Sequence, residues 1–342
     1  MRWSTVFLFL LSTMALAGCK KEPGPTEDAP STTAPETAHD VDEPTTAPGE
    51  GRAESEGSQF SKATPAVLEV LERGGEPRRT LGWSAEPGVK QILKITVDTE
   101  FEALIGILNT KQAPRSEMFE LTLETDESAL DEPRFVSFTI NEARVLDSNE
   151  TPPKVRKKLE EAMGVLPGLQ GRYPVDSLGT LEEVVLNLPL DASREAQSIA
   201  SDLKWALRQL AVAFPAEPVG PGATWTVGHR IDQNGIDANE VSTLKITKVH
   251  RQLVTMERDV QQTAEPQTVR KPGSASNAEL TKFTAQGGSK IVWELTKPAP
   301  RFMKMTLTEN KRLHWEFQGQ RVMAEAVTKR ALRIGREGSD SR

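Results

Sequence analysis

The sequence predicts an α+β fold that is mainly antiparallel β, arranged as a curled sheet or half-barrel with one long and one short helix packed on one face. Three observations support this: apolar and polar side chains alternate over much of residues 62–334, turn-forming residues separate the alternating runs, and only two segments show helical periodicity. Strands and helices do not alternate as βαβ units, which disfavours a parallel sheet. We expect a sheet with this many strands to curl or split.

Strands with one buried face place apolar side chains at every second position. Leu93, Ile95 and Val97 alternate in this way with charged and hydroxylated neighbours. The same alternation occurs at residues 119–123, 136–140, 291–295, 303–307 and 313–317. We therefore predict a strand at each of these segments.

Turn-forming residues indicate how these strands are joined. Asn234-Gly235 is the strongest hairpin signal, and it is expected to join a strand from Trp225 to one through Leu244 and Ile246. Further turns are expected at Gly287-Gly288, Glu309-Asn310 and Gln318-Gly319. Their short spacing predicts an antiparallel meander in the last quarter of the chain.

A short helix is predicted after Thr151, whose side chain can cap it, with Pro152-Pro153 in the first turn. Its apolar positions up to Gly164 are Val155, Leu159 and Met163. The spacing of these three residues places them on one face.

A longer helix is predicted over residues 191–214, with Asp191 as its cap and Pro215 as its end. Its apolar stripe consists of Ala196, Ile199, Leu203, Ala206, Leu207, Leu210 and Phe214. Between the two helices, residues 169–175 and 181–188 are expected to form another pair of strands.

The first residues have the organisation of a secretory signal. Met1-Arg2 gives a positive start, and residues 6–16 are apolar except for Ser12 and Thr13. This run is shorter than the roughly 20 residues that span a bilayer. We expect residues 1–18 to be a signal peptide that is absent from the mature protein.

Leu16-Ala17-Gly18-Cys19 resembles the lipobox of bacterial lipoproteins. The resemblance implies cleavage after Gly18 and acyl chains on Cys19, which would hold the protein at a membrane. Cys19 is the only cysteine, so it cannot form an internal disulfide. Lys20 favours the periplasmic face of the outer membrane over the inner membrane under the enterobacterial sorting rule, with surface exposure as a further alternative.

Residues 19–61 are rich in Pro, Thr, Ala, Ser and acids and have almost no large apolar side chains. Such a segment cannot bury enough surface to fold, and we interpret it as a disordered acidic tether. After the lysines beside Cys19, Arg52 is the only basic residue in this segment, whereas acidic residues are numerous. The rest of the chain has nearly equal numbers of acidic and basic residues. This balance argues against nucleic acid as a partner. Residues 335–342 are expected to be a flexible tail.

The sequence shows no catalytic, cofactor or metal signature. His229, His250 and His314 are scattered, and no thiol remains once Cys19 is acylated. No nucleophile elbow or phosphate loop is present. Acids are numerous, so a hydrolase of envelope polymers stays as a third alternative, but the expected protein is not an enzyme and binds no cofactor.

The segment Pro215-Ala-Glu-Pro-Val-Gly-Pro-Gly-Ala-Thr-Trp225 is the most distinctive part of the domain, and Trp225 is expected to cap the core. It resembles a Pro-x-x-Pro-Val-Gly-x-Gly-x-x-Trp element in a family of uncharacterised bacterial envelope lipoproteins. The resemblance extends loosely from Arg79 to Leu332. It implies a secreted β-rich domain of unknown function and carries no catalytic residues.

Two functions follow from these features. The first is a non-enzymatic interaction or structural module that contacts an envelope protein. The second is a periplasmic module for lipid or another hydrophobic ligand, by analogy of architecture with lipoprotein-localisation proteins. Its candidate ligand-facing residues are Ile199, Leu203, Leu210, Trp293 and Trp315, although such side chains more often belong to the core.

Overall fold

The structure, a computed structural model, describes residues 66–127, 134–146, 151–175, 179, 183–233, 235–270, 277–317 and 319–335. The chain divides into two units, Met1–Lys62 and Ala63–Arg342, and all the described residues belong to the second. The predicted signal peptide, lipobox and tether therefore lie outside the described residues, as does nearly all of the predicted tail.

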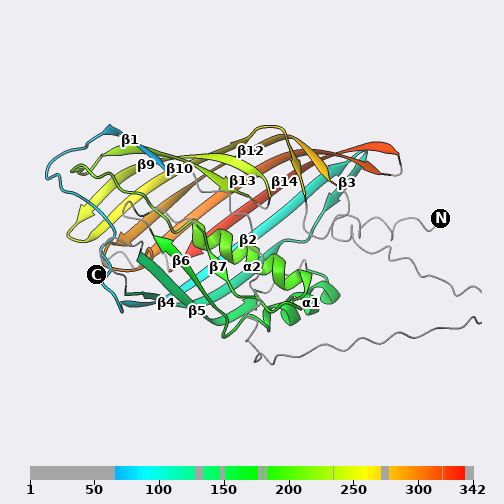
Figure 1. The fold of residues 1–342 in the computed structure, drawn as a ribbon, viewed down its shortest axis with the longest axis horizontal. Helices are drawn as coiled ribbons and strands as arrows, with labels where there is room; N and C mark the ends of the chain where they lie inside the picture. Colours follow the sequence, from blue (N-terminus) through cyan, green and yellow to red (C-terminus); the bar gives the residue numbers. More distant parts are fainter. Residues whose placement is uncertain are drawn as a thin grey trace, which may run out of the picture. The chain divides into compact units, whose positions relative to one another are not determined.

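The described residues form one antiparallel sheet of fourteen strands with two helices, which confirms the prediction of a mainly antiparallel β fold (Figure 1). The strands are β1 (Val67–Glu72), β2 (Lys90–Ile105), β3 (Leu108–Lys111), β4 (Arg115–Thr125), β5 (Arg134–Val145), β6 (Gln170–Val175), β7 (Val185–Leu186), β8 (Thr224–Asp232), β9 (Asp237–His250), β10 (Leu253–Ala264), β11 (Gln267–Val269), β12 (Ala278–Glu294), β13 (Phe302–Phe317) and β14 (Gln320–Ile334). The helices are α1 (Pro153–Met163) and α2 (Arg194–Arg208).

The sheet consists of two meanders. Strands β2, β4, β5, β6 and β7 form the N-terminal meander, and β8, β9, β10, β12, β13 and β14 form the C-terminal meander. The two are joined where the last strand, β14, pairs with β2, so that Leu332 lies opposite Val97. Within the described residues the sheet remains open, with β1 and β7 as its end strands.

Two of the predicted turns are confirmed. Strands β8 and β9 pair as a hairpin up to Asp232 and Asp237, and Gly235 has the positive φ of 80° that such a turn requires. Strands β13 and β14 likewise pair up to Phe317 and Gln320, around Gly319 with a φ of 75°. Asn234 and Gln318 lie outside the described residues.

Two other predicted turns are wrong, because the strands continue through them. Gly287-Gly288 lies inside β12, where Gly287 is opposite Val260 on one side and Leu307 on the other. A Cβ at Gly287 would lie 2.0 Å from the Thr306 carbonyl oxygen. This glycine therefore permits close approach of two strands and not a change of direction.

Glu309-Asn310 lies inside β13, with Glu309 opposite Ala285 and Thr328. The ladders on both sides pair every residue around this position, and the Glu309 side chain is fully buried. Turn propensity here is overridden by two long neighbouring strands.

The short helix is confirmed, but its predicted cap is wrong. The N-cap of α1 is Pro152, without a side-chain cap, and the Thr151 hydroxyl instead donates to the Pro114 carbonyl at 3.3 Å. Leu159 and Met163 are buried as predicted, whereas Val155 is 46% exposed.

The long helix is shorter than predicted at both ends. Its cap is Ser193, whose hydroxyl accepts from the Ala196 N–H at 3.1 Å, and not Asp191. It ends at Arg208, before Pro215, in a tight turn where the Leu210 N–H donates to the Leu207 carbonyl three residues back, at 3.0 Å. Farther along, the Trp225 indole N–H donates to the Ala213 carbonyl at 2.9 Å. The chain after α2 is thus fixed against the sheet.

The predicted strand pair between the helices is present as β6 and β7, with Gly171 opposite Leu186. Strand β7 is only two residues long, and residues 180–182 lie outside the described part of the chain.

One apolar cluster contains side chains from both helices and from most strands. In the N-terminal meander, the alternating residues Phe119, Leu121 and Leu123 have no exposed surface. Helix α1 contacts β5 and α2, and α2 contacts β2 and β7. The core therefore contains side chains from both helices and from both meanders.

Candidate functional site

The five predicted ligand-facing residues do not form one surface. Ile199 and Leu203 of α2 are fully buried in the core. Leu210 and Trp293 come together near the end of α2 and line a small cavity. Trp315 is half-buried on β13, opposite Val322, and takes no part in that cavity.

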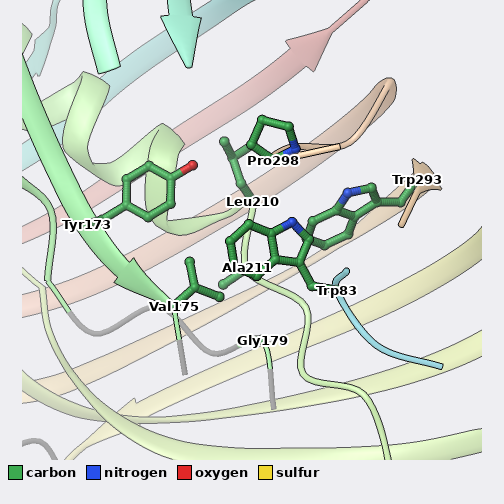
Figure 2. Close-up of a pocket in the computed structure, with 8 residues that line it drawn as sticks. All are labelled: Trp83, Tyr173, Val175, Gly179, Leu210, Ala211, Trp293 and Pro298. Carbon is green, nitrogen blue, oxygen red and sulfur yellow. The ribbon is translucent and has the colours of Figure 1, made fainter. Parts of the chain in front are cut away.

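The small cavity lies beside Leu210, just after the end of α2, and is bounded also by Trp83, Tyr173, Trp293 and Pro298, among others (Figure 2). Its volume is about 10 Å³, which is the space of one water molecule. The Tyr173 hydroxyl is buried and has no hydrogen-bond partner among the described residues, and burial raises its pKa above the ordinary value. In this conformation the space is far too small for an acyl chain.

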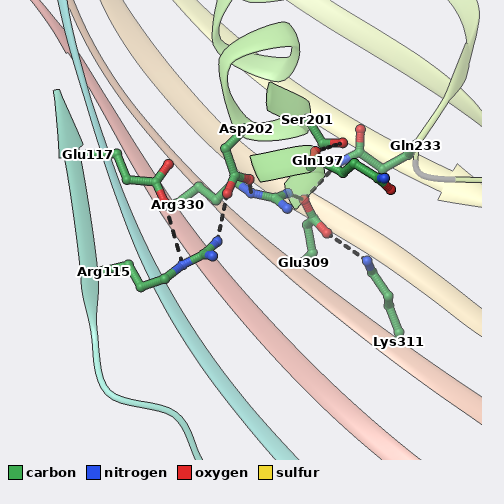
Figure 3. A network of polar contacts seen from close by, with 9 residues as sticks. All are labelled: Arg115, Glu117, Gln197, Ser201, Asp202, Gln233, Glu309, Lys311 and Arg330. Carbon is green, nitrogen blue, oxygen red and sulfur yellow. Dashed lines mark hydrogen bonds and ion pairs between the residues drawn. The ribbon is translucent and has the colours of Figure 1, made fainter. Parts of the chain in front are cut away.

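A buried polar network lies between α2 and the sheet (Figure 3). The Asp202 carboxylate of α2 is 2.6 Å from Arg115 Nη2 of β4 and 3.7 Å from Arg330 Nε of β14. The Arg330 guanidinium also lies 5.3 Å from the ring centroid of Trp205 on α2. Because Arg115 and Arg330 belong to different meanders, Asp202 connects α2 to both halves of the sheet.

The network continues to Glu309 on β13. Its carboxylate accepts hydrogen bonds from Arg330 and from the Gln233 amide, and it lies 3.0 Å from Lys311 Nζ. Burial alone would raise the pKa of Glu309, but Arg330 and Lys311 hold it below its ordinary value. Glu309 is therefore a buried, ionised anchor for these cations.

Glu117 on β4 differs from Glu309 because its pKa is raised and not lowered. Burial raises the pKa of its carboxyl to about 8, and the nearby Asp202 carboxylate acts in the same direction, against the opposing effects of Arg115 and Arg330. Its closest ion-pair partner, Arg115 Nε, is 3.7 Å away, and neither carboxyl oxygen has a hydrogen-bond partner in the described structure. Glu117 is thus held protonated near neutral pH.

The sequence contains a signal for the buried acids of this network. Glu117 has the same strand parity as the buried Phe119, and Glu309 has the same parity as Met305 and Leu307. A charged residue at an inward-facing strand position predicts a buried ionic group. The partners of these charges could not be predicted, because they come from distant strands.

An open groove of about 580 Å³ lies at the edge of the core, lined by residues 79–84 together with Pro215, Ala216, Gln252 and Leu295. The distinctive Pro-rich segment, residues 215–225, forms part of this groove and also holds Arg79 in place. The backbones of Arg79 and Val219 exchange two hydrogen bonds, of 3.0 and 2.9 Å. Trp225, at the end of that segment, is fully buried in the core. This volume is in the range of ligand-binding clefts.

Arg79 is the only charged residue among those lining the groove. Its Nε and Nη2 atoms are shielded from solvent and have no hydrogen-bond partner in the described part of the chain. Nothing local in the sequence distinguishes Arg79 from Arg78 beside it.

Neither a metal site nor a membrane-spanning helix is apparent in the described residues. No group of three or more His, Cys, Asp or Glu side chains there is arranged to hold a metal ion. His229, His250 and His314 lie on β8, β9 and β13, respectively. None of the described helices is long and apolar enough to cross a membrane.

No family model matches this chain, and no curated protein sequence is significantly similar to it.

Proposed function

We propose that this chain is a lipid-anchored protein of the cell envelope whose β-rich domain is a non-enzymatic interaction module. The Leu-Ala-Gly-Cys sequence supports acylation of Cys19, and two or three acyl chains give stable membrane attachment. The acidic segment 19–61 would allow the domain to reach a partner at some distance from the membrane surface.

We further propose the finer architecture of a half-barrel with both helices on one face. The contacts of α1 with β5 and of α2 with β2 and β7 support it, as does the burial of Ile199, Leu203 and Leu207 against the same core as the strands. Figure 1 shows α1 and α2 beside each other next to the long strands.

The observation that supports the interaction role is the difference in volume between the interior cavity and the surface groove. The cavity beside Leu210 measures about 10 Å³, whereas the open groove beside Arg79 measures about 580 Å³. A packed interior with an accessible groove suits a module that binds a partner at its surface better than one that encloses a ligand.

Photocrosslinking in cells tests this proposal. A photoreactive amino acid at Gln252, which is exposed at the groove, should trap one defined envelope protein. The same amino acid at Ile107, which is 95% exposed but does not line the groove, is the matched control. Substitution Cys19→Ser should abolish the crosslink while leaving the thermal unfolding of the purified protein unchanged. Equal crosslinking from both positions, or no dependence on Cys19, would contradict the proposal.

A second candidate function, binding of lipid or another hydrophobic ligand, is supported by the way α2 is attached. Asp202 and its two arginines place buried charges between the helix and the sheet. Apolar residues of similar volume often stabilise such a contact as well as buried ion pairs do. Ligand binding would require α2 to separate from the sheet, which breaks these ion pairs and exposes its apolar stripe. Native mass spectrometry of the Cys19→Ser protein should then show a copurifying lipid, and consistent absence of bound lipid would exclude this function.

A further inference from the structure

The groove beside Arg79 is built from backbone segments that are held in place by hydrogen bonds. The Ser84 N–H donates to the Leu295 carbonyl at 2.8 Å, and the Leu295 N–H donates to the Gln252 carbonyl at 2.9 Å. The Trp83 indole N–H donates to the Lys297 carbonyl at 3.0 Å. The groove therefore exists before any ligand binds, which lowers the entropic cost of binding.

The Arg79 guanidinium has an unused pair of donors. Nε and Nη2 form one edge of the guanidinium plane, the edge that can donate two parallel hydrogen bonds to one carboxylate. The neighbouring arginines are engaged: Arg78 donates to the Gly74 carbonyl, and Arg73 Nη2 lies 2.5 Å from Glu217. Arg79 is thus distinguished from its neighbours by two buried donors that lack an acceptor in the described structure, a situation that is unfavourable until a ligand supplies one.

The remaining surface of the groove indicates the kind of anion. No Asp or Glu lines it, and Arg79 is its single charge, which matches one carboxylate better than a doubly charged phosphate group. Trp83, which is half-buried, and Ala216, which is exposed, provide apolar surface beside the arginine. An extended peptide places further side chains on either side of an acid, where apolar ones can contact this surface.

We infer that this groove binds an acidic peptide segment, whose carboxylate pairs with the Arg79 guanidinium edge while its flanking apolar side chains contact Trp83 and Ala216. Because both nitrogens are shielded from solvent in this conformation, binding requires rotation of the terminal torsions of Arg79. The inference rests on the proposed function, since it names the class of partner that the interaction module takes.

The test is a titration of the full chain, carrying Cys19→Ser, with synthetic hexapeptides that differ only at a central residue. The central residue is Glu, Asp, Gln or Lys, between fixed leucine, valine and proline flanks, and binding is followed by calorimetry. The Glu and Asp peptides should bind at least about tenfold more tightly than the Gln peptide, as expected for a charge-assisted hydrogen bond. The Lys peptide should not bind.

Substitution Arg79→Gln should remove the preference for Glu over Gln, and Arg79→Lys should retain only part of it because an ammonium group cannot form the parallel pair of bonds. Arg78→Gln is the matched control, since it removes an adjacent arginine that already has its own acceptors. It should bind the Glu peptide as the parent chain does. Equal melting temperatures of these variants would show that folding is unaffected.

Three results would overturn the inference: equal binding of the Glu and Gln peptides, an unchanged preference in Arg79→Gln, or Arg79-dependent binding of inorganic phosphate or phosphatidylglycerol vesicles without binding of the Glu peptide. The proposed function is judged separately. If crosslinking from Gln252 persists in cells with Arg79→Gln, the interaction module stands and only the acidic-peptide specificity fails.

Discussion

The Asp202 carboxylate of α2 lies 2.6 Å from the Arg115 guanidinium of β4, and both side chains are largely removed from solvent. The same carboxylate faces Arg330 of β14, in the other meander. A single acid on a helix therefore holds cations from both halves of the sheet. Since removing one partner of a buried ion pair leaves an uncompensated charge, this contact has a large effect on stability when it is broken.

Substitution Asp202→Asn should destabilise the domain by about 3 kcal/mol, because Arg115 and Arg330 would stay buried without their shared counter-ion. The free energy of unfolding in urea measures this. The matched control is Glu279→Gln, whose partner Arg321 is 2.7 Å away on the exposed surface, and its effect should stay below about 1 kcal/mol. Similar losses for the two variants would show that the network under α2 contributes no more than a surface pair.

Substitution Glu117→Gln should flatten the pH dependence of stability. The pKa of Glu117 is raised to about 8 in the folded protein from an ordinary value of 4.5, so between these pH values the folded state retains a proton that the unfolded state has released. The stability of the parent chain should therefore fall as pH rises across this window, by at most about 1.4 kcal/mol per pH unit from this group. The glutamine variant lacks this contribution.

Urea unfolding at pH 5, 7 and 9 measures the effect of Glu117. The advantage of the glutamine variant over the parent chain should be small at pH 5 and largest at pH 9. Parallel pH profiles for the two proteins would mean that Glu117 is not protonated in the fold.

Substitution Gly287→Ala should destabilise the sheet strongly, because the new Cβ would lie 2.0 Å from the Thr306 carbonyl oxygen and would force β12 and β13 apart. Gly228→Ala is the matched control: this glycine also lies inside a strand, β8, but its Cβ would meet nothing within 4 Å. Differential scanning calorimetry should show a large drop in Tm for the first variant and little change for the second. Equal Tm values would refute the close approach of the two strands.

Substitution Tyr173→Phe should be neutral or slightly stabilising, within about 1 kcal/mol, since it removes a buried hydroxyl that has no partner in the described structure and keeps the ring. Tyr173→Ala, which leaves a large void beside Trp293, should cost about 3–5 kcal/mol. Chemical unfolding of both variants provides the comparison. A clear loss of stability in the phenylalanine variant would reveal a hydrogen-bonded water in the small cavity.

The sequence by itself was enough to predict the class of the fold and most of its elements. Period-2 alternation at residues such as Leu93, Ile95 and Val97 depends only on which side chains face the core, so it located strands that the structure contains. The apolar stripe through Ile199 and Leu203 located α2 in the same way. The lipobox prediction for Cys19 is local as well, and it stays a prediction because that residue lies outside the described structure.

Only the tertiary structure decided which turn signals are turns, where α2 ends and which charges are buried. Gly287 and Glu309 lie in strands because neighbours distant in sequence pair with them on both sides, and the chain after α2 is held where the Trp225 indole N–H binds the Ala213 carbonyl. The pairing of Asp202 with Arg115, and the isolation of Arg79 beside an open groove, depend on the same long-range contacts. Local patterns report which face of an element is buried, whereas register, strand order and ionic partners are set by packing across the whole sheet.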